Sequence, residues 1–311
     1  MNYRVFIHTN PKQIVGAIVA RHALQRHSPN ADKFDVELIN TADHAFLAEH
    51  EGRDYLRNGI HRVWLNDDLQ SFTPLRFMPP EIMGYQGRAL VIDPDIFAVA
   101  DVYELLTRDM GGKAILCRQR SGTKGVVDRC FASSVMLLDC AKLSHWQCET
   151  QFRAMFDFKL DYHDWICLKR EPRESIGMFE NEWNDFDRLT ARTKMLHNTR
   201  RKTQPWKTGL PVDWRPAERF RAFPPIGWLM RARRKLFGEY AFLGAYSRHP
   251  DHNQERLFFG LLAECMALGL VTEDMLQAEI AQRHVRDDAL QVLKRTAPLA
   301  PPPGPPMALP A

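Results

Sequence analysis

The chain has 311 residues, of which 45% are hydrophobic and 26% are charged, and its formal net charge is +4. These values are typical of a globular protein, and the length fits one large α/β domain, alone or with a smaller addition. No apolar run approaches the roughly 20 residues of a membrane span, and the N-terminus lacks the apolar segment of a signal peptide. We therefore expect a cytoplasmic protein. The net charge of +4 is a small excess that favours no particular partner, and we expect none that is a nucleic acid.

The six cysteines lie at positions 117, 130, 140, 148, 167 and 265, and no two of them form a C-x-x-C pair. Most stand in apolar runs, which is typical of reduced thiols in the core of a cytosolic protein. The spacing also argues against a zinc site. We therefore expect all six cysteines to be reduced.

Strand-like and helix-like segments alternate through the first two thirds of the chain. Residues 3–8 form the first predicted strand, and Asn10 and Pro11 then mark the start of a helix with apolar residues at helical spacing. Further strands are predicted at 33–40, 88–93, 113–118, 134–139 and 193–199, and further helices at 102–110 and 141–157. This alternation predicts a largely parallel sheet with helices on both faces.

After Trp206 the pattern becomes helical, with predicted helices at 225–238, 253–270 and 272–293. Thr272 is placed to cap the last of these. The proline-rich residues 296–311 predict a disordered tail. The expected organisation is thus an α/β domain over residues 1–210, a helical region over 211–295 and the tail.

The predicted helix at 226–237 is amphipathic and basic. Its apolar face carries Ile226, Leu229, Met230, Leu236 and Phe237, and Arg231, Arg234 and Lys235 lie off that face. A helix of this kind can lie on an anionic membrane surface. An ordinary packed helix with a solvated basic edge is the alternative.

The stretch RALVIDPDIF (88–97) ends an apolar strand on two aspartates. Pro94 cannot donate to a sheet ladder, so strand pairing should stop there, and Asp93 and Asp95 should lie where ligands bind in open α/β sheets. Two adjacent carboxylates repel each other unless a cation relieves them, and a hard divalent cation prefers oxygen ligands. Two solvated acids at a strand end are the simpler interpretation. A third is a phosphohydrolase of the haloacid-dehalogenase type, although Phe97 stands where that class has a small or β-branched residue.

Four blocks occur in an order that resembles the family 8 glycosyltransferases, which include glycogenin and bacterial lipopolysaccharide galactosyl- and glucosyltransferases. The blocks are TNPKQIVGAIVARHALQRHS (9–28), FTPLRFMPPEIMGYQGRALVIDPDIFAVADVYELL (72–106), FASSVMLLDCAKL (131–143) and HNTRRKTQPWK (197–207). The resemblance covers about residues 3 to 207. It implies a GT-A fold, with a Rossmann-like, mostly parallel sheet flanked by helices, and retaining transfer from a UDP-sugar with Mn²⁺ or Mg²⁺ as cofactor.

The resemblance also implies roles for single residues. The metal-binding D-x-D falls on Asp93 and Asp95, and the histidine of the family's late H-x-x-G-x-x-K-P-W motif falls on His197, the implied third ligand. Manganese accepts both carboxylate and imidazole, and a core histidine at a strand end is the alternative. The implied uracil and ribose contacts are His8, Thr9, Asn10 and Gln13. Arg76 would add positive charge near the departing diphosphate.

The sequence departs from the family pattern at three places. Arg200 replaces the glycine of the late motif and one extra residue precedes Pro205, so Lys202 becomes the candidate phosphate-facing lysine, with Arg200 and Arg201 as further cations. Ala132 stands where the family pattern has an asparagine, which the resemblance implies would touch the sugar. The family's Asp-Gln pair maps near DYHDW (161–165), where Asp161 and Asp164 both remain candidates to stabilise the transient sugar cation.

Three functions therefore stay open. The first is a metal-dependent hexosyltransferase that acts on a glycan, a lipopolysaccharide or a lipid-linked acceptor, with peripheral contact to the inner face of a bacterial membrane through 226–237. The second is a catalytically silent relative that binds a nucleotide-sugar. The third is the D-x-D phosphohydrolase.

Overall fold

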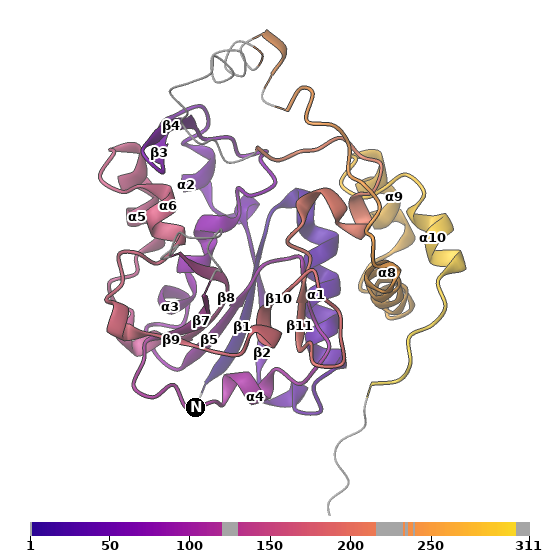
Figure 1. Cartoon of the computed structure of the whole chain (residues 1–311), viewed down its shortest axis with the longest axis horizontal. Coiled ribbons are helices and arrows are strands. Elements are labelled where there is room, and N and C mark those ends of the chain that lie inside the picture. Colours follow the sequence, from indigo (N-terminus) through magenta and orange to yellow (C-terminus); the bar gives the residue numbers. More distant parts are fainter. Residues whose placement is uncertain (1, 120–129, 216–232, 234–235, 239, 303–311) are drawn as a thin grey trace, which may run out of the picture.

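The computed structural model describes residues 2–119, 130–215, 233, 236–238 and 240–302 (Figure 1). Its strands are β1 Tyr3–Thr9, β2 Asp35–Asn40, β3 Asp54–Arg57, β4 Ile60–Val63, β5 Arg88–Ile92, β6 Ile96–Ala98, β7 Ile115–Gln119, β8 Phe131–Asp139, β9 Ile176–Met178, β10 Asp185–Phe186 and β11 Met195–His197. Its α-helices are α1 Ile14–Arg26, α2 Ala45–Ala48, α3 Pro79–Ile82, α4 Tyr103–Leu106, α5 Cys148–Phe156, α6 Tyr162–Ile166, α8 His252–Ala267, α9 Glu273–Ala281 and α10 Ala289–Arg295.

A six-stranded sheet in the order β2-β1-β5-β8-β7-β9 forms the centre of the molecule. Its β2–β1, β1–β5 and β7–β9 pairs are parallel, whereas β8 runs antiparallel to both of its neighbours. Figure 1 shows α1 and α8 on one side of this sheet and α3, α5 and α6 on the other. The expected mostly parallel sheet with helices on both faces is therefore confirmed.

The pairing registers bring three strand ends together. Ile7 of β1 pairs with Ile92 of β5, so that the next residues of the two strands, His8 and Asp93, lie side by side. Because β8 is antiparallel, its first residues meet the last residues of β5: Ile92 pairs with Val135, and the Asp93 amide donates to the Ser134 carbonyl over 3.1 Å. Polar residues from β1, β5 and β8 therefore lie together at one end of the strands, where β1 and β5 end and β8 begins.

A small second sheet, β10-β11-β6, begins where the first one ends. Between β5 and β6 the chain passes only through Asp93, Pro94 and Asp95, so this turn crosses from one sheet to the other. The helix α1 packs tightly against the turn, since a Cβ added to Gly16 would stand 2.8 Å from the Pro94 carbonyl oxygen. Glycine at position 16 therefore allows this close approach.

Several predicted elements are shorter than expected. The helix predicted at 102–110 has only the four residues of α4, and α5 occupies only the second half of the segment 141–157. The single helix predicted at 272–293 is wrong: α9 ends at Ala281 and α10 begins at Ala289, because the chain turns at Arg283 with a φ of 59°. The Thr272 side chain does cap α9, accepting from the Met275 amide over 3.1 Å.

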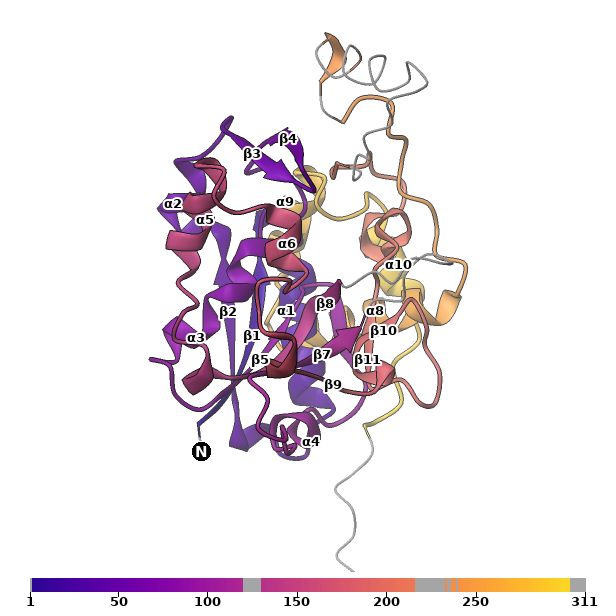
Figure 2. The same cartoon turned by 60° about the vertical axis from the view of Figure 1, so that its left-hand side comes forward.

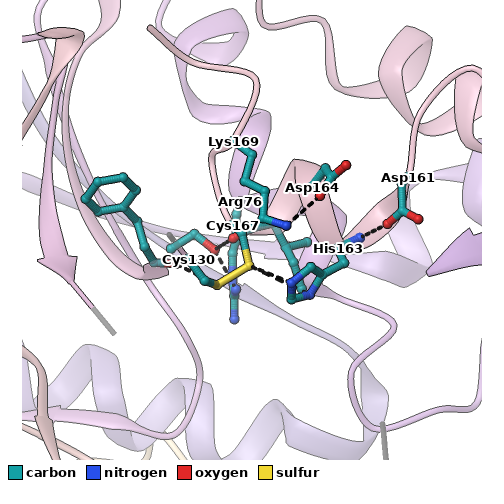
Figure 3. Close-up of a disulfide and its surroundings, with 10 residues drawn as sticks. Arg76, Cys130, Asp161, His163, Asp164, Cys167 and Lys169 are labelled. Atoms are coloured by element: carbon teal, nitrogen blue, oxygen red, sulfur yellow. Dashed lines mark hydrogen bonds and ion pairs between the residues drawn. A yellow bond between two sulfur atoms is a disulfide. The ribbon is translucent and has the colours of Figure 1, made fainter. Parts of the chain in front are cut away.

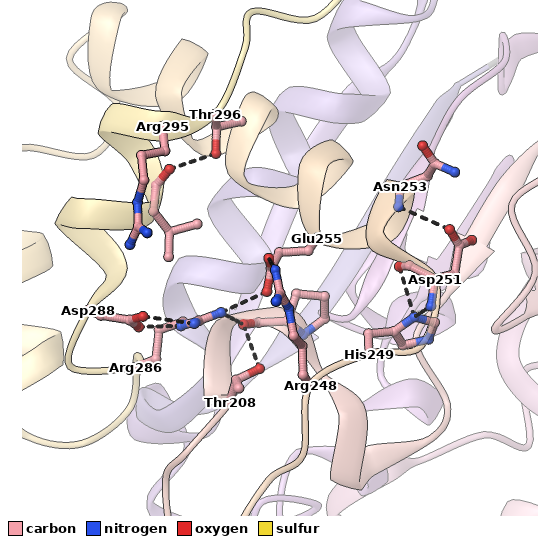
Figure 4. Close-up of polar contacts among 12 residues, drawn as sticks. Thr208, Arg248, His249, Asp251, Asn253, Glu255, Arg286, Asp288, Arg295 and Thr296 are labelled. Atoms are coloured by element: carbon pink, nitrogen blue, oxygen red, sulfur yellow. Dashed lines mark hydrogen bonds and ion pairs between the residues drawn. The ribbon is translucent and has the colours of Figure 1, made fainter.

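The C-terminal helices pack against the α/β part. The Phe258 ring of α8 stacks on Trp206 with 4.6 Å between ring centroids, and it also meets the edge of Phe97 in β6. Polar contacts reinforce this packing (Figure 4): Arg286 forms a two-pronged ion pair with Asp288 and also pairs with Glu255 of α8. Figure 2 shows α8, α9 and α10 gathered beside α1.

The predicted tail and the predicted basic helix lie partly outside the described residues. Within the described part of the tail, Leu299 packs directly on Gly260, and Arg26 donates to the Ala300 carbonyl over 2.6 Å. This segment is therefore held against α1 and α8, which corrects the expectation of disorder from residue 296.

Of the segment 226–237, the structure describes only residues 233, 236 and 237, and Leu236 and Phe237 are exposed. None of the described helices is long and apolar enough to cross a bilayer.

The prediction of six reduced cysteines is wrong for two of them. Cys130, just before β8, and Cys167, just after α6, form a disulfide bond (Figure 3). The sheet and α6 bring together two residues that are separated by 37 positions, and no spacing pattern in the sequence marks this pair. The other four cysteines are buried thiols, and burial raises the pKa of Cys117 and of Cys140 to about 12.

Candidate active site

A cavity of about 280 Å³ opens at the sheet edge where β1, β5 and β8 bring their polar residues together. It contains the predicted residues Gln13, Arg76, Asp93, Asp95 and His197. The remaining lining residues are Arg57, Leu69, Gln70, Phe72 and Thr73, residues 131–134 of β8, Ile166 of α6, and Phe186, Thr199 and Gln204 near the second sheet. The crossover turn thus lies in the wall of a cavity, as ligand sites do in open α/β sheets.

Asp93, Asp95 and His197 converge as the sequence predicted. One ligand atom from each lies within 4.8 Å of the other two, and all three residues are buried. Their positions follow from the strands: Asp93 follows β5, Asp95 precedes β6, and His197 ends β11, which pairs with β6 so that His197 lies opposite Ile96. The Asn198 amide also donates to the Asp95 carbonyl over 3.1 Å.

The orientation of His197 suits a metal ligand. Its Nδ1 lies 2.8 Å from Oδ1 of Asn184, and the Asn184 amide nitrogen donates to Ser134 Oγ over 3.0 Å. The Asn184 oxygen can accept from Nδ1 of His197, which leaves Nε2 facing Asp95 Oδ1 at 3.5 Å. Metal-binding histidines are oriented in this way by an acceptor on their second nitrogen.

The two aspartates have different partners. Asp95 Oδ2 accepts from the neutral side-chain amide of Gln204 over 2.9 Å. Asp93 instead accepts from His8 Nε2 over 2.6 Å and forms a two-pronged ion pair with Arg76. Burial raises the pKa of Asp93, but Arg76 and His8 lower it more, and the pKa lies well below its ordinary value. Burial lowers the pKa of His8, which keeps this ring neutral.

The donor set fits a divalent cation. Two carboxylates and one imidazole are ligands that manganese accepts, whereas magnesium prefers oxygen ligands alone. Asn184 and Gln204 hold His197 and Asp95 from behind, as a preformed site requires.

Of the four residues predicted to hold the nucleoside, only Gln13 lines the cavity. His8 is buried behind the lining, between Asp93 and the Phe72 ring. Thr9 donates to the Asn10 carbonyl, and the Asn10 side chain donates to Asp68 O, Leu69 O and Ser71 Oγ. Asn10 therefore positions the segment 69–73, which in turn forms a wall of the cavity.

The cavity lining includes neither Asp161 nor Asp164. Figure 3 shows Asp161 beside His163 and Asp164 beside Lys169. Asp161 caps α6 through the His163 amide and accepts from the amides of Asn58 and Gly59 over 2.9 and 2.8 Å. Asp164 is solvated and pairs with Lys169 over 2.8 Å. Both carboxylates thus have local structural partners, and Ile166 is the residue that α6 contributes to the cavity.

Lys202 also lies outside this cavity, in a more open one of about 380 Å³ that it shares with Arg200, Thr203 and Trp214. Its Nζ donates to the Leu243 carbonyl over 3.0 Å. Thr199 lines both cavities, so the two adjoin. Arg200 and Lys202 are therefore neighbours of the site rather than part of its wall.

Sequence reasoning missed Asn184, Gln204, Ser134, Arg57 and Phe186. Gln204 directly precedes the Pro205-Trp206 pair of the late motif, so its position gave a usable signal. Asn184 comes from a short 3-10 helix, Asn181–Asn184, that no periodicity marks. Ser134 becomes important only because β8 runs antiparallel to β5.

No protein-family profile and no curated protein sequence matches this chain. Solved structures do match in shape. The glycosyltransferase GlyE from Streptococcus pneumoniae shares 14% identity over 87% of this chain, with a TM-score of 0.46, and the chain covers 64% of GlyE. The galactosyltransferase LgtC, solved with donor and acceptor sugar analogs, shares 12% identity over 68% of this chain and 91% of its own, with a TM-score of 0.44. Mouse xyloside xylosyltransferase 1 shares 14% identity over 64% of this chain and 98% of its own, with a TM-score of 0.41.

Proposed function

We propose that this chain is a metal-dependent glycosyltransferase of the GT-A type, in residues 1–210, with a helical C-terminal region. It transfers a hexose from a UDP-sugar, with retention of configuration, to a glycan, a lipopolysaccharide or another acceptor. The observation that carries the proposal is the buried Asp93–Asp95–His197 group, with His197 oriented by Asn184, in the wall of a cavity. We further propose a cytoplasmic protein with no nucleic acid partner, in peripheral contact with an anionic membrane through 226–237.

The residues of the chain then have separate tasks. Asp93, Asp95 and His197 would hold Mn²⁺ or Mg²⁺, which neutralises the charge that develops on departing UDP. Gln13 and the segment 69–73 would contact the nucleoside, and Arg200 and Lys202 in the adjoining cavity would attract the diphosphate. The apolar side chains of Phe131, Ile166 and Phe186 exclude water, which would otherwise intercept the reacting sugar carbon. Because Asp161 and Asp164 lie elsewhere, we assign neither of them to this step.

A catalytically silent nucleotide-sugar-binding protein is the second candidate function. It is favoured by Ala132, which lines the cavity where the family has an asparagine, and by the engagement of Asp93 with Arg76. A phosphohydrolase has less support, because Phe97 stands where that class has a small or β-branched residue.

Incubation of the purified chain with UDP-glucose or UDP-galactose and Mn²⁺ separates the three functions. Release or transfer of the sugar supports the glycosyltransferase. Binding of the nucleotide without turnover supports the silent relative, and release of phosphate from phosphomonoesters supports the phosphohydrolase.

Asp95→Asn tests the role of the aspartate in the proposed enzyme. The variant keeps the shape of the side chain but removes a charge from the metal site, so turnover should fall by about two to four orders of magnitude. Mn²⁺-dependent binding of UDP, measured by calorimetry, should weaken in parallel. Asp139→Asn is the matched control. Asp139 is the last residue of β8, where it pairs with Arg88, so it lies at the end of the strands away from the cavity. An Asp95→Asn variant that binds UDP with unchanged metal dependence would show that Asp95 is not a ligand.

A further inference from the structure

All three nitrogens of the Arg76 guanidinium group donate hydrogen bonds to atoms of the protein. Its Nε donates to Asp93 Oδ1 over 2.9 Å, its Nη2 donates to Asp93 Oδ2, and its Nη1 donates to Ser133 Oγ over 2.9 Å. Ser133 Oγ in turn donates to the Ile166 carbonyl over 2.6 Å. Arg76 and Asp93 are only 9% and 6% exposed, so water barely competes for these contacts. A two-pronged ion pair in such surroundings is among the strong ones.

This arrangement conflicts with metal binding by Asp93. The two carboxylate oxygens of Asp93 together accept three hydrogen bonds, two from Arg76 and one from His8. A divalent cation that approached Asp93 would meet the positive charge of Arg76 on the same carboxylate, in a buried place where charges are poorly screened. Asp95 has no such obstacle from Gln204, which is neutral.

A nucleoside diphosphate would remove this conflict. Its phosphate oxygens offer an arginine fork the same geometry as a carboxylate does. Arg76 already lines the cavity, and its backbone is fixed in the 3-10 helix Thr73–Phe77 between buried Leu75 and Phe77. The side chain alone therefore has to turn for the guanidinium to pass from Asp93 to an anion in the cavity.

We propose that Arg76 is a displaceable counter-ion of Asp93, which makes the binding of a divalent cation depend on the binding of a nucleoside diphosphate. This inference rests on the proposed function, because it concerns the same Asp93–Asp95–His197 site. Without the diphosphate, Arg76 occupies Asp93 and the cation binds weakly. With the diphosphate, Arg76 moves to the phosphates and Asp93 becomes a ligand. By thermodynamic linkage, the cation strengthens the binding of the diphosphate by the same factor.

The test is the affinity for Mn²⁺, read from the electron paramagnetic resonance signal of the free ion, with and without UDP. A titration of UDP without protein corrects for the Mn²⁺ that UDP itself binds. For the unaltered chain, UDP should tighten Mn²⁺ binding at least about tenfold. Arg76→Gln should bind Mn²⁺ alone about tenfold or more tightly than the unaltered chain, and UDP should then tighten Mn²⁺ binding by a smaller factor than it does in the unaltered chain.

Two further variants keep the test decisive. Arg286→Gln breaks a comparable two-pronged pair with Asp288 away from the cavity (Figure 4), so it should keep the Mn²⁺ affinities of the unaltered chain. Arg76→Lys retains the charge without the fork and should bind Mn²⁺ alone with intermediate affinity. If Arg76→Gln fails to fold by circular dichroism, Arg76→Lys decides the question.

The possible results separate the inference from the proposed function. If the unaltered chain binds Mn²⁺ with UDP but the Arg76 variants bind Mn²⁺ alone no more tightly, the inference is overturned and the metal site stands. If the unaltered chain binds no Mn²⁺ even with UDP while Arg76→Gln does, Arg76 is a permanent substitute for the cation. That result overturns both the inference and the metal-dependent function, as does an absence of Mn²⁺ binding in every variant.

Discussion

Asn184 determines which nitrogen of His197 faces the two aspartates. Its Oδ1 lies 2.8 Å from Nδ1, and its side-chain amide nitrogen donates to Ser134 Oγ over 3.0 Å, so the amide contacts the ring and β8 at the same time. The Phe186 ring packs edge-on against the His197 ring and limits its rotation. A single buried amide thus holds the ring of the candidate ligand so that Nε2 is the nitrogen that faces Asp95.

Asn184→Ala should therefore weaken Mn²⁺ binding in the presence of UDP by about 10- to 100-fold. Asn184→Asp retains an acceptor for Nδ1 and should recover part of the loss. Asn30→Ala is the control, because the Asn30 side chain also has a side-chain hydrogen-bond partner, Asp101, but lies outside the cavity lining. Calorimetry measures all three affinities, and equal Mn²⁺ binding by Asn184→Ala and the unaltered chain would mean that His197 is not a ligand.

At this scale the sequence was informative where a residue belongs to a motif. Asp93 and Asp95 follow a buried strand, and His197 opens the block that ends in Pro205-Trp206, so their convergence could be predicted. The role of Asn184 could not be predicted, since it depends on a side-chain contact with His197, a residue from another element. That Asp161 lies outside the cavity lining could not be predicted either, because spacing along the chain does not show that its carboxylate turns toward a hairpin.

Among the elements, the hairpin β3–β4 depends on α6 for its position. The Asn58 and Gly59 amides at its turn both donate to Asp161, and Arg57 lies over the ring of Tyr162, the first residue of α6, at 5.0 Å from the centroid. This contact places Arg57 in the wall of the cavity. Asp161 is therefore a structural link between two short elements that are too small to be stable separately.

The stability that Asp161 supplies should depend on pH. Burial raises its pKa, but the backbone amides of Gly59, Asn58 and His163 lower it more, so the folded pKa lies below the ordinary value of 3.8. A carboxyl whose pKa is lowered on folding stabilises the protein above its unfolded pKa and ceases to do so as pH falls through the folded pKa.

Asp161→Ala should accordingly lower the free energy of unfolding by about 1–2 kcal/mol at neutral pH, which is the usual cost of a lost helix cap. This difference from the unaltered chain should shrink as pH falls below 3.8. Urea unfolding at several pH values measures it. Asp157→Ala is the control, because Asp157 is exposed and pairs with nearby Lys159. A difference that stays constant with pH would show that the Asp161 charge has no role.

Across the whole molecule, the disulfide joins the sheet to the layer of helices on one face. Cys130 precedes β8 and Cys167 follows α6, and both adjoin residues of the cavity wall, Phe131 and Ile166. The Phe131 amide also donates to the Cys167 carbonyl over 3.3 Å. The bond therefore restrains the two segments that face the crossover turn.

Reduction of this bond should lower the free energy of unfolding by about 4 kcal/mol, because it releases a loop of 37 residues in the unfolded chain. The measurement is denaturant unfolding with and without a reductant. A variant with Cys130→Ser and Cys167→Ser should be less stable than the oxidised chain and insensitive to the reductant. If the reductant destabilised this variant as much as the unaltered chain, the effect would not come from the disulfide.

The α/β class and the position of β5 could be predicted, because alternating strand and helix patterns and an unbroken apolar run are local signals. The antiparallel insertion of β8 between β5 and β7 could not, since strand order depends on contacts between distant segments. The disulfide escaped prediction for the same reason. The break between α9 and α10 was missed because a left-handed residue at Arg283 interrupts a pattern whose apolar spacing continues.

The crossover turn has a consequence for local unfolding. The second sheet contains strands of only two or three residues, a size that gives little stability by itself. Asp93 is anchored in the first sheet, whereas Asp95 and His197 belong to the second, so any ligand that bridges them closes a link between the two sheets. Such a ligand would slow amide hydrogen exchange in β6 and β11 more than in β1 or β2, because it acts on the part of the fold that opens most easily.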